Sequence, residues 1–337
     1  MIHEWEKKVD VCGEDCEIEI SSFLQNMTSD VISRTAFGSS YKEGMKIFEI
    51  QQKQADLVYF ALQSPIPWFL PTKTNKKIKE MKIEIDRLVK VIIERREKSM
   101  GKGEGGGDGD LLGVLLENNL KEKVIKNDDA MSIEDVIEEC KLFYFTGQVT
   151  TSNLLVWAIV SLGIHSEWQT LARDEIRQAF GDNVPDFDGL NRLKIVTMIL
   201  YEVLRLYPPS PMMMRVVQKE TKIGHMSLPA GSQLMVPIIF IHRDRQLWGE
   251  DVEEFKPERF AKGLAAASDR QGSFLPFGGG PRTCIGNNFA MMEAKMALSL
   301  ILRRFSFELS PSYVHAPTLV VTLRPQFGAQ VVLRKCV

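Results

Sequence analysis

Apolar side chains recur at helical spacing along most of the chain and predict a succession of helices. From Ile20 onward, the apolar positions Phe23, Leu24, Met27 and Val31 are spaced so that they lie on one face of a helix. The same periodicity predicts further helices over residues 42–62, 73–98, 132–163, 167–180, 191–207 and 285–305.

A minor β component begins after the Tyr207-Pro-Pro turn. Short runs of β-forming residues bounded by turn residues predict strands over residues 213–217, 221–225, 233–236, 318–323 and 329–333. Because these runs are few and short beside the helices, the pattern predicts a mainly α fold with minor β, in an α+β arrangement.

The helix expected over residues 132–163 is the longest. Ser132 followed by Ile-Glu-Asp is typical of an N-cap with acidic residues in the first turn. About 32 residues would span about 48 Å, enough to cross a whole domain. Gly147 and the hydroxyls of Thr146, Thr150 and Thr151 lower the helix propensity halfway along. Two interpretations stay open, a tolerated kink and an opening in the helix beside a bound ligand.

Two segments interrupt the helical pattern of the first half. Three prolines exclude a helix from Ser64 to Pro71 and predict an apolar loop there. Residues 101–110, rich in glycine, predict a flexible linker. Between them, residues 73–98 carry ten Lys and Arg against five Asp and Glu. This basic face is interpreted as solvated, with contact to an anionic membrane surface as the alternative.

Composition excludes several classes of protein. The 337 residues are 44% hydrophobic and carry a net charge of -2, which gives no reason to expect nucleic-acid binding. Five cysteines in a chain of this length do not form a disulfide framework. No run reaches the roughly 18–20 consecutive apolar residues of a membrane span, and the charged N-terminus resembles no signal peptide.

The segment from Phe274 to Gly286 carries the candidate chemistry. A Gly/Pro loop holds Cys284 just before a predicted helix, whose N-terminus favours a thiolate, and Arg282 is placed to pair with an anion. A lone cysteine without ligand-spaced Cys or His excludes a zinc site. Haem iron needs only one axial protein ligand, so a thiolate-bound haem suits this segment. A nucleophilic cysteine and a purely structural one are the alternatives.

Four motifs in this order resemble those of the cytochrome P450 superfamily of haem-thiolate monooxygenases, along essentially the whole chain. Phe277, Gly280, Arg282, Cys284 and Gly286 match F-x-x-G-x-R-x-C-x-G. The other three are Glu202-x-x-Arg205, the P-E-R-F of Pro257 to Phe260 and the oxygen-activation motif at Thr146 to Thr151. The sequence around them, including Ile241-His-Arg-Asp244, resembles the plant clan 72 branch.

The resemblance implies a role for each matched residue. Cys284 would be the axial ligand of haem b, in a loop shaped by Gly280 and Gly286, with Phe277 against the haem. Arg215 and Arg282 would pair with its anionic groups. Thr150, together with Gly147 and Gln148, would serve dioxygen activation. Glu202, Arg205 and Arg259 would form a buried charge-assisted network that fixes the core beside the haem.

The implied reaction is insertion of one oxygen atom of O2 into a lipophilic small molecule of the terpenoid or isoprenoid-hormone class. Electrons would come from NADPH through a cytochrome P450 reductase. The family also implies the cytosolic face of the endoplasmic reticulum membrane, with the Pro65–Pro71 loop as a membrane contact. Two alternatives are a catalytically inert fragment and a haem-thiolate isomerase or dehydratase.

Two departures from the family pattern bear on these expectations. Val149 stands where the family usually has an acid that organises proton delivery. The chain is also short for the family and has no W-x-x-x-R motif. We therefore expect residues 1–337 to form a single partial P450 domain without the N-terminal anchor, first sheet and early helices. Its parts would be helices and a pocket-covering loop over 1–100, the linker, the oxygen-activation helix 132–163 and a haem-binding half over 191–337.

Overall fold

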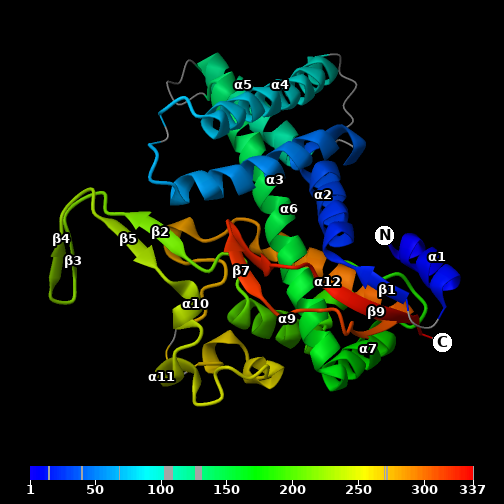
Figure 1. The fold of residues 1–337 in the computed structure, drawn as a ribbon. Coiled ribbons are helices and arrows are strands. Elements are labelled where there is room, and N and C mark those ends of the chain that lie inside the picture. Colours follow the sequence, from blue (N-terminus) through cyan, green and yellow to red (C-terminus); the bar gives the residue numbers. More distant parts are fainter. Residues whose placement is uncertain are drawn as a thin grey trace. The chain divides into compact units, whose positions relative to one another are not determined.

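The fold is mainly helical with small antiparallel sheets, as predicted (Figure 1). The computed structural model describes residues 1–13, 16–38, 41–67, 69–101, 109–125, 131–268, 270 and 272–336. The chain divides into two compact units, one of residues 1–21 and 153–337 and the other of residues 22–152. Each unit is described by itself.

Long helices build the unit of residues 22–152. They are α2 (Ser21–Phe37), α3 (Tyr41–Gln63), α4 (Lys73–Gly101), α5 (Leu111–Ile125) and the first part of α6 (Ile133–Ile164). Apolar side chains from all five helices form one core, in which Tyr144 stacks on Phe37 with ring centroids 4.0 Å apart. Ile85, Val89 and Ile93 bury the apolar face of α4 in this core, as its periodicity predicted.

The N-terminus of α6 confirms the predicted cap. The Ser132 hydroxyl accepts a hydrogen bond from the Asp135 backbone N–H at 3.1 Å, and the Asp135 carboxylate accepts one from the Ser132 N–H at 2.9 Å. This reciprocal pair satisfies two backbone donors that the helix itself leaves free. Among the described helices, α6 alone is long and apolar enough to cross a bilayer, but most of its apolar stretch is buried inside the protein, as in a core helix.

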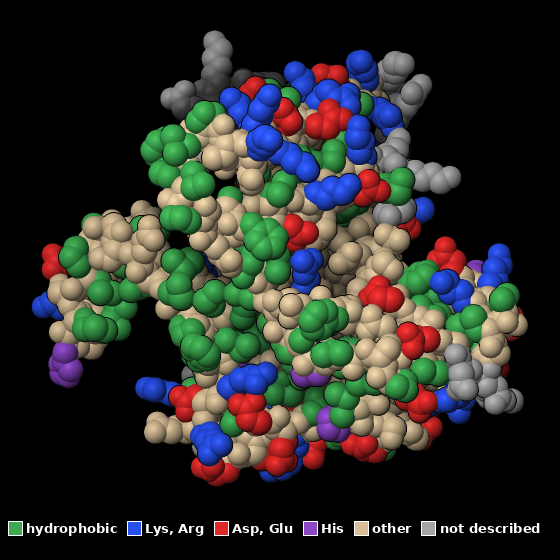
Figure 2. All heavy atoms as spheres, in the orientation of Figure 1, with side chains coloured by type: hydrophobic (Ala, Val, Ile, Leu, Met, Phe, Trp, Pro, Cys, Tyr) green, Lys and Arg blue, Asp and Glu red, His purple; other side chains and the backbone are tan. Residues whose placement is uncertain are grey.

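Some of the basic side chains of α4 pair with acidic side chains. Lys and Arg side chains gather over this helix in Figure 2. Lys82 contacts Asp86 and Glu138, and Arg87 and Lys46 both contact Glu84. Exposed pairs of this kind add little stability.

The segments between these helices agree only partly with the sequence analysis. Pro65–Pro71 connects α3 to α4, and its Ile66, Phe69 and Leu70 side chains are exposed. The predicted linker 101–110 lies largely outside the described residues. At its ends α4 continues to Gly101, and Asp110 pairs with Arg96 and caps α5 through the Gly113 N–H.

The other unit combines helices with four small sheets. Besides the last part of α6, its α-helices are α1 (Ile2–Cys12), α7 (Ser166–Phe180), α8 (Phe187–Arg192), α9 (Ile195–Leu206), α10 (Ile238–Ile241), α11 (Arg245–Trp248) and α12 (Asn287–Arg304). The largest sheet has the order β1-β9-β6, formed by Cys16–Glu19, Gln330–Lys335 and Phe305–Leu309. The two-stranded sheets pair β2 (Met213–Val216) with β5 (Gln233–Val236), β3 (Thr221–Ile223) with β4 (Met226–Leu228), and β7 (Pro317–Val320) with β8 (Thr322–Pro325).

This unit differs from the prediction at several elements, among them β6, α10 and α11, which were not predicted. The single strand expected over 318–323 is a tight hairpin, because Val321 adopts a left-handed backbone conformation with φ 63° and reverses the chain between β7 and β8. The N-terminal residues, for which no element was predicted, form α1 and β1. Trp5 of α1 is completely buried and contacts Phe305 edge to face, and β1 pairs with β9 near the C-terminus.

Candidate functional site

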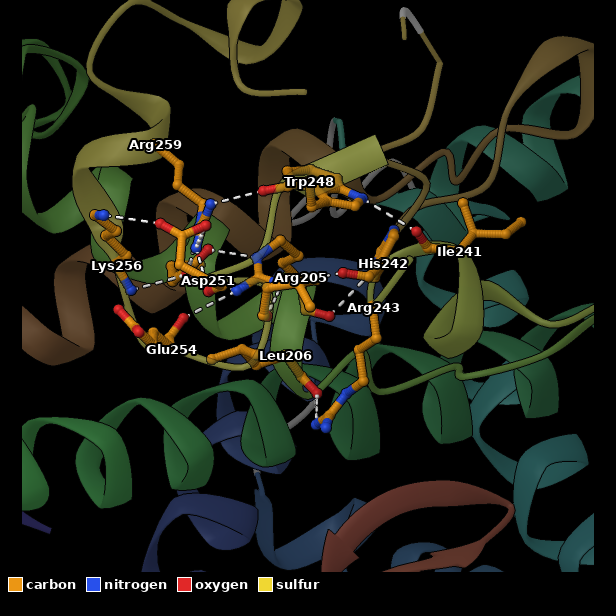
Figure 3. Close-up of polar contacts among 12 residues, drawn as sticks. Arg205, Leu206, Ile241, His242, Arg243, Trp248, Asp251, Glu254, Lys256 and Arg259 are labelled. Atoms are coloured by element: carbon orange, nitrogen blue, oxygen red, sulfur yellow. Dashed lines mark hydrogen bonds and ion pairs between the residues drawn. The ribbon is translucent and has the colours of Figure 1, made fainter. Parts of the chain in front are cut away.

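A buried carboxylate pairs with two guanidiniums in the unit of residues 1–21 and 153–337. Figure 3 shows the two arginines, Arg205 and Arg259, and their other polar contacts. Glu202 and Arg205 project from the buried face of α9 and are both 0% exposed. Their i,i+3 spacing brings them into a two-point ion pair, with both N–O distances 2.7 Å. Arg205 also donates to the carbonyl oxygens of His242, Val252 and Glu254 at 2.7–3.1 Å. Its donors are therefore well satisfied despite complete burial.

The second guanidinium comes from the short 3-10 helix η1 (Pro257–Phe260), with proline in its first turn. The Nε of Arg259 lies 3.4 Å from Oε1 of Glu202, and its Nη2 lies 2.7 Å from a carboxylate oxygen of Asp251. The Lys256 backbone N–H also donates to Glu202, at 2.8 Å. The structure thus brings together Glu202, Arg205 and Arg259, and joins α9 to the segment from 251 to 260.

Aromatic side chains pack around this network. Trp248 lies under the Arg205 guanidinium, 5.4 Å from ring centroid to Cζ, and also contacts Phe260 and Phe274. Two members of this layer, Trp248 and His242, were not predicted from the sequence. His242 is completely buried between the network and Phe274, on whose ring it stacks with centroids 5.4 Å apart. Burial lowers the pKa of His242 to about 4, so its imidazole is neutral at pH 7.

The Cys284 loop is a tight turn held by backbone hydrogen bonds. The Gly278 N–H donates to the Leu275 carbonyl at 3.0 Å, and the Cys284 N–H donates to the Phe277 carbonyl at 2.8 Å. Gly278 and Gly280 have φ of 71° and 70°, a conformation that side chains disfavour. Gly286 follows as the N-cap residue of α12, two residues after the exposed thiol of Cys284. A side chain larger than a methyl group at Gly286 would crowd the sulfur, because a Cβ there would already lie 3.9 Å from it.

Two arginines accompany this loop. Arg215 on β2 lies beside Gly278, since a Cβ at that glycine would be 3.8 Å from an Arg215 guanidinium nitrogen. Arg282 belongs to the loop itself and is exposed. Across the described residues, neither guanidinium is paired with a carboxylate. The loop and β2 together thus present one thiol and two cations without a carboxylate partner, of which Arg215 is partly buried.

The predicted oxygen-activation residues lie on α6, on the stretch that belongs to the unit of residues 22–152. The helix is continuous through them, and the Thr150 hydroxyl donates to the Thr146 carbonyl one turn earlier, at 2.7 Å. Gly147 permits close packing, because a Cβ there would lie 2.8 Å from side-chain atoms of Ile32 on α2. Gln148 and Val149 are buried, and the Gln148 carbonyl accepts from Thr28 at 3.1 Å.

The donor set of the Cys284 loop fits a haem better than a metal ion held by protein alone. The part of the chain that the structure describes contains no group of three or more His, Cys, Asp or Glu side chains able to hold a metal ion. A haem requires one axial protein ligand and brings its own four nitrogens and two carboxylates. One exposed thiol next to two uncompensated arginines matches those needs.

Comparisons with known proteins give a consistent family. The cytochrome P450 family model matches residues 1–326. Cytochrome P450 72A397 of Kalopanax septemlobus is 54% identical over 99% of this chain, and cytochrome P450 72A15 of Arabidopsis thaliana is 52% identical over 99%. Cytochrome P450 CYP72A219 of Panax ginseng is 51% identical over the whole chain. The chain spans 65–66% of the length of these relatives.

Proposed function

This chain belongs to the cytochrome P450 family, and from that membership we propose that it is the haem-binding part of a monooxygenase that inserts one atom of O2 into a lipophilic small molecule. The observation that carries the proposal is the loop from Phe277 to Gly286. It holds the exposed Cys284 thiol at the start of α12, with two arginines that no carboxylate of the described chain neutralises.

In this proposal Cys284 would hold haem b, the cofactor of the family, through its sulfur. Thiolate-ligated haem supplies redox chemistry with O2, and electron donation from sulfur favours O–O cleavage. Arg215 and Arg282 would bind the anionic groups of the haem, since a guanidinium matches a carboxylate in shape and charge. Phe277 would pack against the haem.

The proposed role of the buried network of Glu202, Arg205 and Arg259 is structural. Glu202 and Arg205 are 0% exposed, so neither can contact a substrate. The network's proposed task is to hold α9 against the segment from 251 to 260 and so to keep the layer next to the Cys284 loop rigid. Such positioning of the supporting shell is what a cofactor site requires of its scaffold.

Proton delivery is assigned to α6. The Thr150 hydroxyl, which now donates to the Thr146 carbonyl, is the group proposed to donate hydrogen bonds during dioxygen activation, with Gln148 and water as further donors. Val149 offers no proton at the position where the family usually has an acid. We therefore expect imperfect coupling, in which part of the electron flow ends as hydrogen peroxide.

Val149→Glu is expected to improve that coupling. Because Val149 is buried, the introduced carboxyl would have a raised pKa and would be largely protonated at neutral pH, which makes it a proton donor. The measurement is peroxide released per NADPH consumed in the reductase-supported reaction, with Val149→Gln as a nearly isosteric control that carries no acid. A clear drop with Glu and none with Gln is expected. Equal peroxide release in all three proteins would contradict this assignment.

The substrate, partner and location are proposed from the family. We propose a terpenoid or isoprenoid hormone as substrate and NADPH–cytochrome P450 reductase as electron donor, on the cytosolic face of the endoplasmic reticulum membrane. The exposed apolar side chains Ile66, Phe69 and Leu70 of the Pro65–Pro71 segment support a membrane contact there.

Turnover under 18O2 tests the reaction type. The chain is supplied with haem, reductase, NADPH and a panel of terpenoids. One 18O atom per product molecule and strict dependence on reductase are the expected results. Product formed without reductase and without label would favour an isomerase or dehydratase. Haem uptake without any turnover would favour the inert fragment.

A further inference from the structure

His242 is a buried group to which neither the sequence motifs nor the proposed reaction assigns a task. All five histidines of the chain are described, and only His242 is fully buried. It follows α10 directly and is enclosed by Arg205, Trp248 and Phe274. A buried polar ring requires partners for both of its nitrogens.

Those partners fix the chemical state of the ring. Nε2 of His242 lies 2.9 Å from the Leu275 backbone nitrogen, and Nδ1 lies 3.2 Å from the Arg205 carbonyl oxygen. A backbone N–H can only donate and a carbonyl oxygen can only accept. The proton therefore resides on Nδ1, and the lone pair of Nε2 accepts from Leu275. An imidazolium would oppose two N–H donors at Leu275 and break this contact.

The ring connects two parts of the fold. On one side, Arg205 of the buried network donates to the His242 carbonyl at 3.0 Å and accepts from its ring. On the other side, Leu275 begins the turn that holds the thiol. The Leu275 carbonyl accepts from Gly278, and the Phe277 carbonyl accepts from Cys284. A short series of hydrogen bonds thus runs from α9 through the imidazole into the Cys284 loop.

We propose that His242 is a positioning residue that anchors the Cys284 loop to α9 through the Leu275 amide. This inference rests on the proposed function only in assigning Cys284 as the haem ligand. The anchor itself is a property of the polypeptide. Loss of the acceptor would leave a buried N–H without a partner and would let the loop open locally without global unfolding.

Hydrogen exchange at the Leu275 amide in the haem-free chain tests the anchor directly. His242→Phe keeps a ring of similar size and its contact with Phe274 but removes both hydrogen bonds. Exchange at Leu275 is expected to become faster by roughly tenfold or more, because one buried donor is left unsatisfied. Haem affinity is expected to fall in the same variant.

Two further variants control the experiment. His315→Phe makes the same substitution at a histidine that bonds Tyr313 and Tyr207 in the same unit, and should leave Leu275 exchange unchanged. His242→Gln offers an amide oxygen where Nε2 now accepts, and should restore much of the protection. If His242→Phe does not fold, His242→Leu takes its place, because leucine also lacks an acceptor and is smaller.

The outcomes separate the anchor from the proposed reaction. Faster exchange in His242→Phe, with protection retained in His242→Gln, supports the anchor even if the chain shows no monooxygenase activity. Unchanged Leu275 exchange in a folded His242→Phe variant overturns it. Unchanged exchange in a folded His242→Leu variant overturns it as well.

Discussion

Replacing Glu202 with alanine is expected to lower the free energy of unfolding by about 3–5 kcal/mol, because it leaves a buried guanidinium without a counter-ion. Arg205 is 0% exposed and keeps only neutral carbonyl acceptors once the carboxylate is removed. The Arg259 guanidinium keeps a counter-ion, because it still contacts Asp251 at 2.7 Å. Glu202→Gln should destabilise the fold less than Glu202→Ala does, because the amide retains one acceptor oxygen.

Urea unfolding followed by far-ultraviolet circular dichroism measures this loss. Glu308→Ala is a matched control, since Glu308 pairs with Arg334 at the same 2.7 Å but both side chains are largely exposed. Removal of that exposed pair should cost at most about 1 kcal/mol. Equal destabilisation by the two substitutions would mean that the Glu202 network contributes no more than a surface ion pair.

Acidification from about pH 6.5 to about pH 4 is expected to remove about 3 kcal/mol of stability through His242 alone. Burial lowers the pKa of this histidine from 6.5 to about 4, with the neighbouring Arg205 guanidinium acting in the same direction. Between these two values the unfolded chain binds a proton that the folded chain excludes. Stability therefore rises with pH across this window and is fully present above it.

His242→Gln isolates the contribution, because glutamine does not titrate while the other groups are unchanged. The ion pair with Lys256 and the hydrogen bond with Arg259 hold the pKa of Asp251 at about 2. The stability that this carboxylate contributes is therefore lost mainly below pH 4, and equally in both proteins. The free energy of unfolding is measured at intervals between pH 4 and pH 7.5. The wild type should show the steeper slope. Parallel slopes would mean that His242 is as easily protonated in the fold as in the unfolded chain.

Local pattern was sufficient to predict most helices. The apolar spacing in 73–98 and the cap at Ser132 correspond to α4 and α6, because both signals act within one or two turns. Elements that depend on distant partners were not predictable in this way. β1 is four residues long and is stabilised by pairing with β9, more than three hundred residues away. The β7–β8 turn carries Val321, with none of the glycine or asparagine that signals such turns.

The same distinction applies to the candidate site. Motif spacing pointed to Glu202, Arg205 and Arg259, and the structure places them in contact. The partner of His242 is the backbone N–H of Leu275. Because a backbone N–H is present at every residue except proline, the sequence gives no signal for this contact. For Gly147 the sequence suggested a kink or an opening, whereas the structure shows close packing against Ile32, which depends on how α2 crosses α6.

The assignment of Cys284 as the thiolate ligand is the central claim, and the absorption spectrum of the reduced, carbon monoxide-treated protein tests it most directly. The chain is reconstituted with haem, reduced and exposed to carbon monoxide, in parallel with Cys284→Ser and with Cys336→Ser as a matched cysteine control. We expect the red-shifted band of thiolate-ligated haem in the wild type and in Cys336→Ser, and its complete loss in Cys284→Ser. A red-shifted band that survives in Cys284→Ser, or haem uptake by the wild type without such a band, would contradict that assignment.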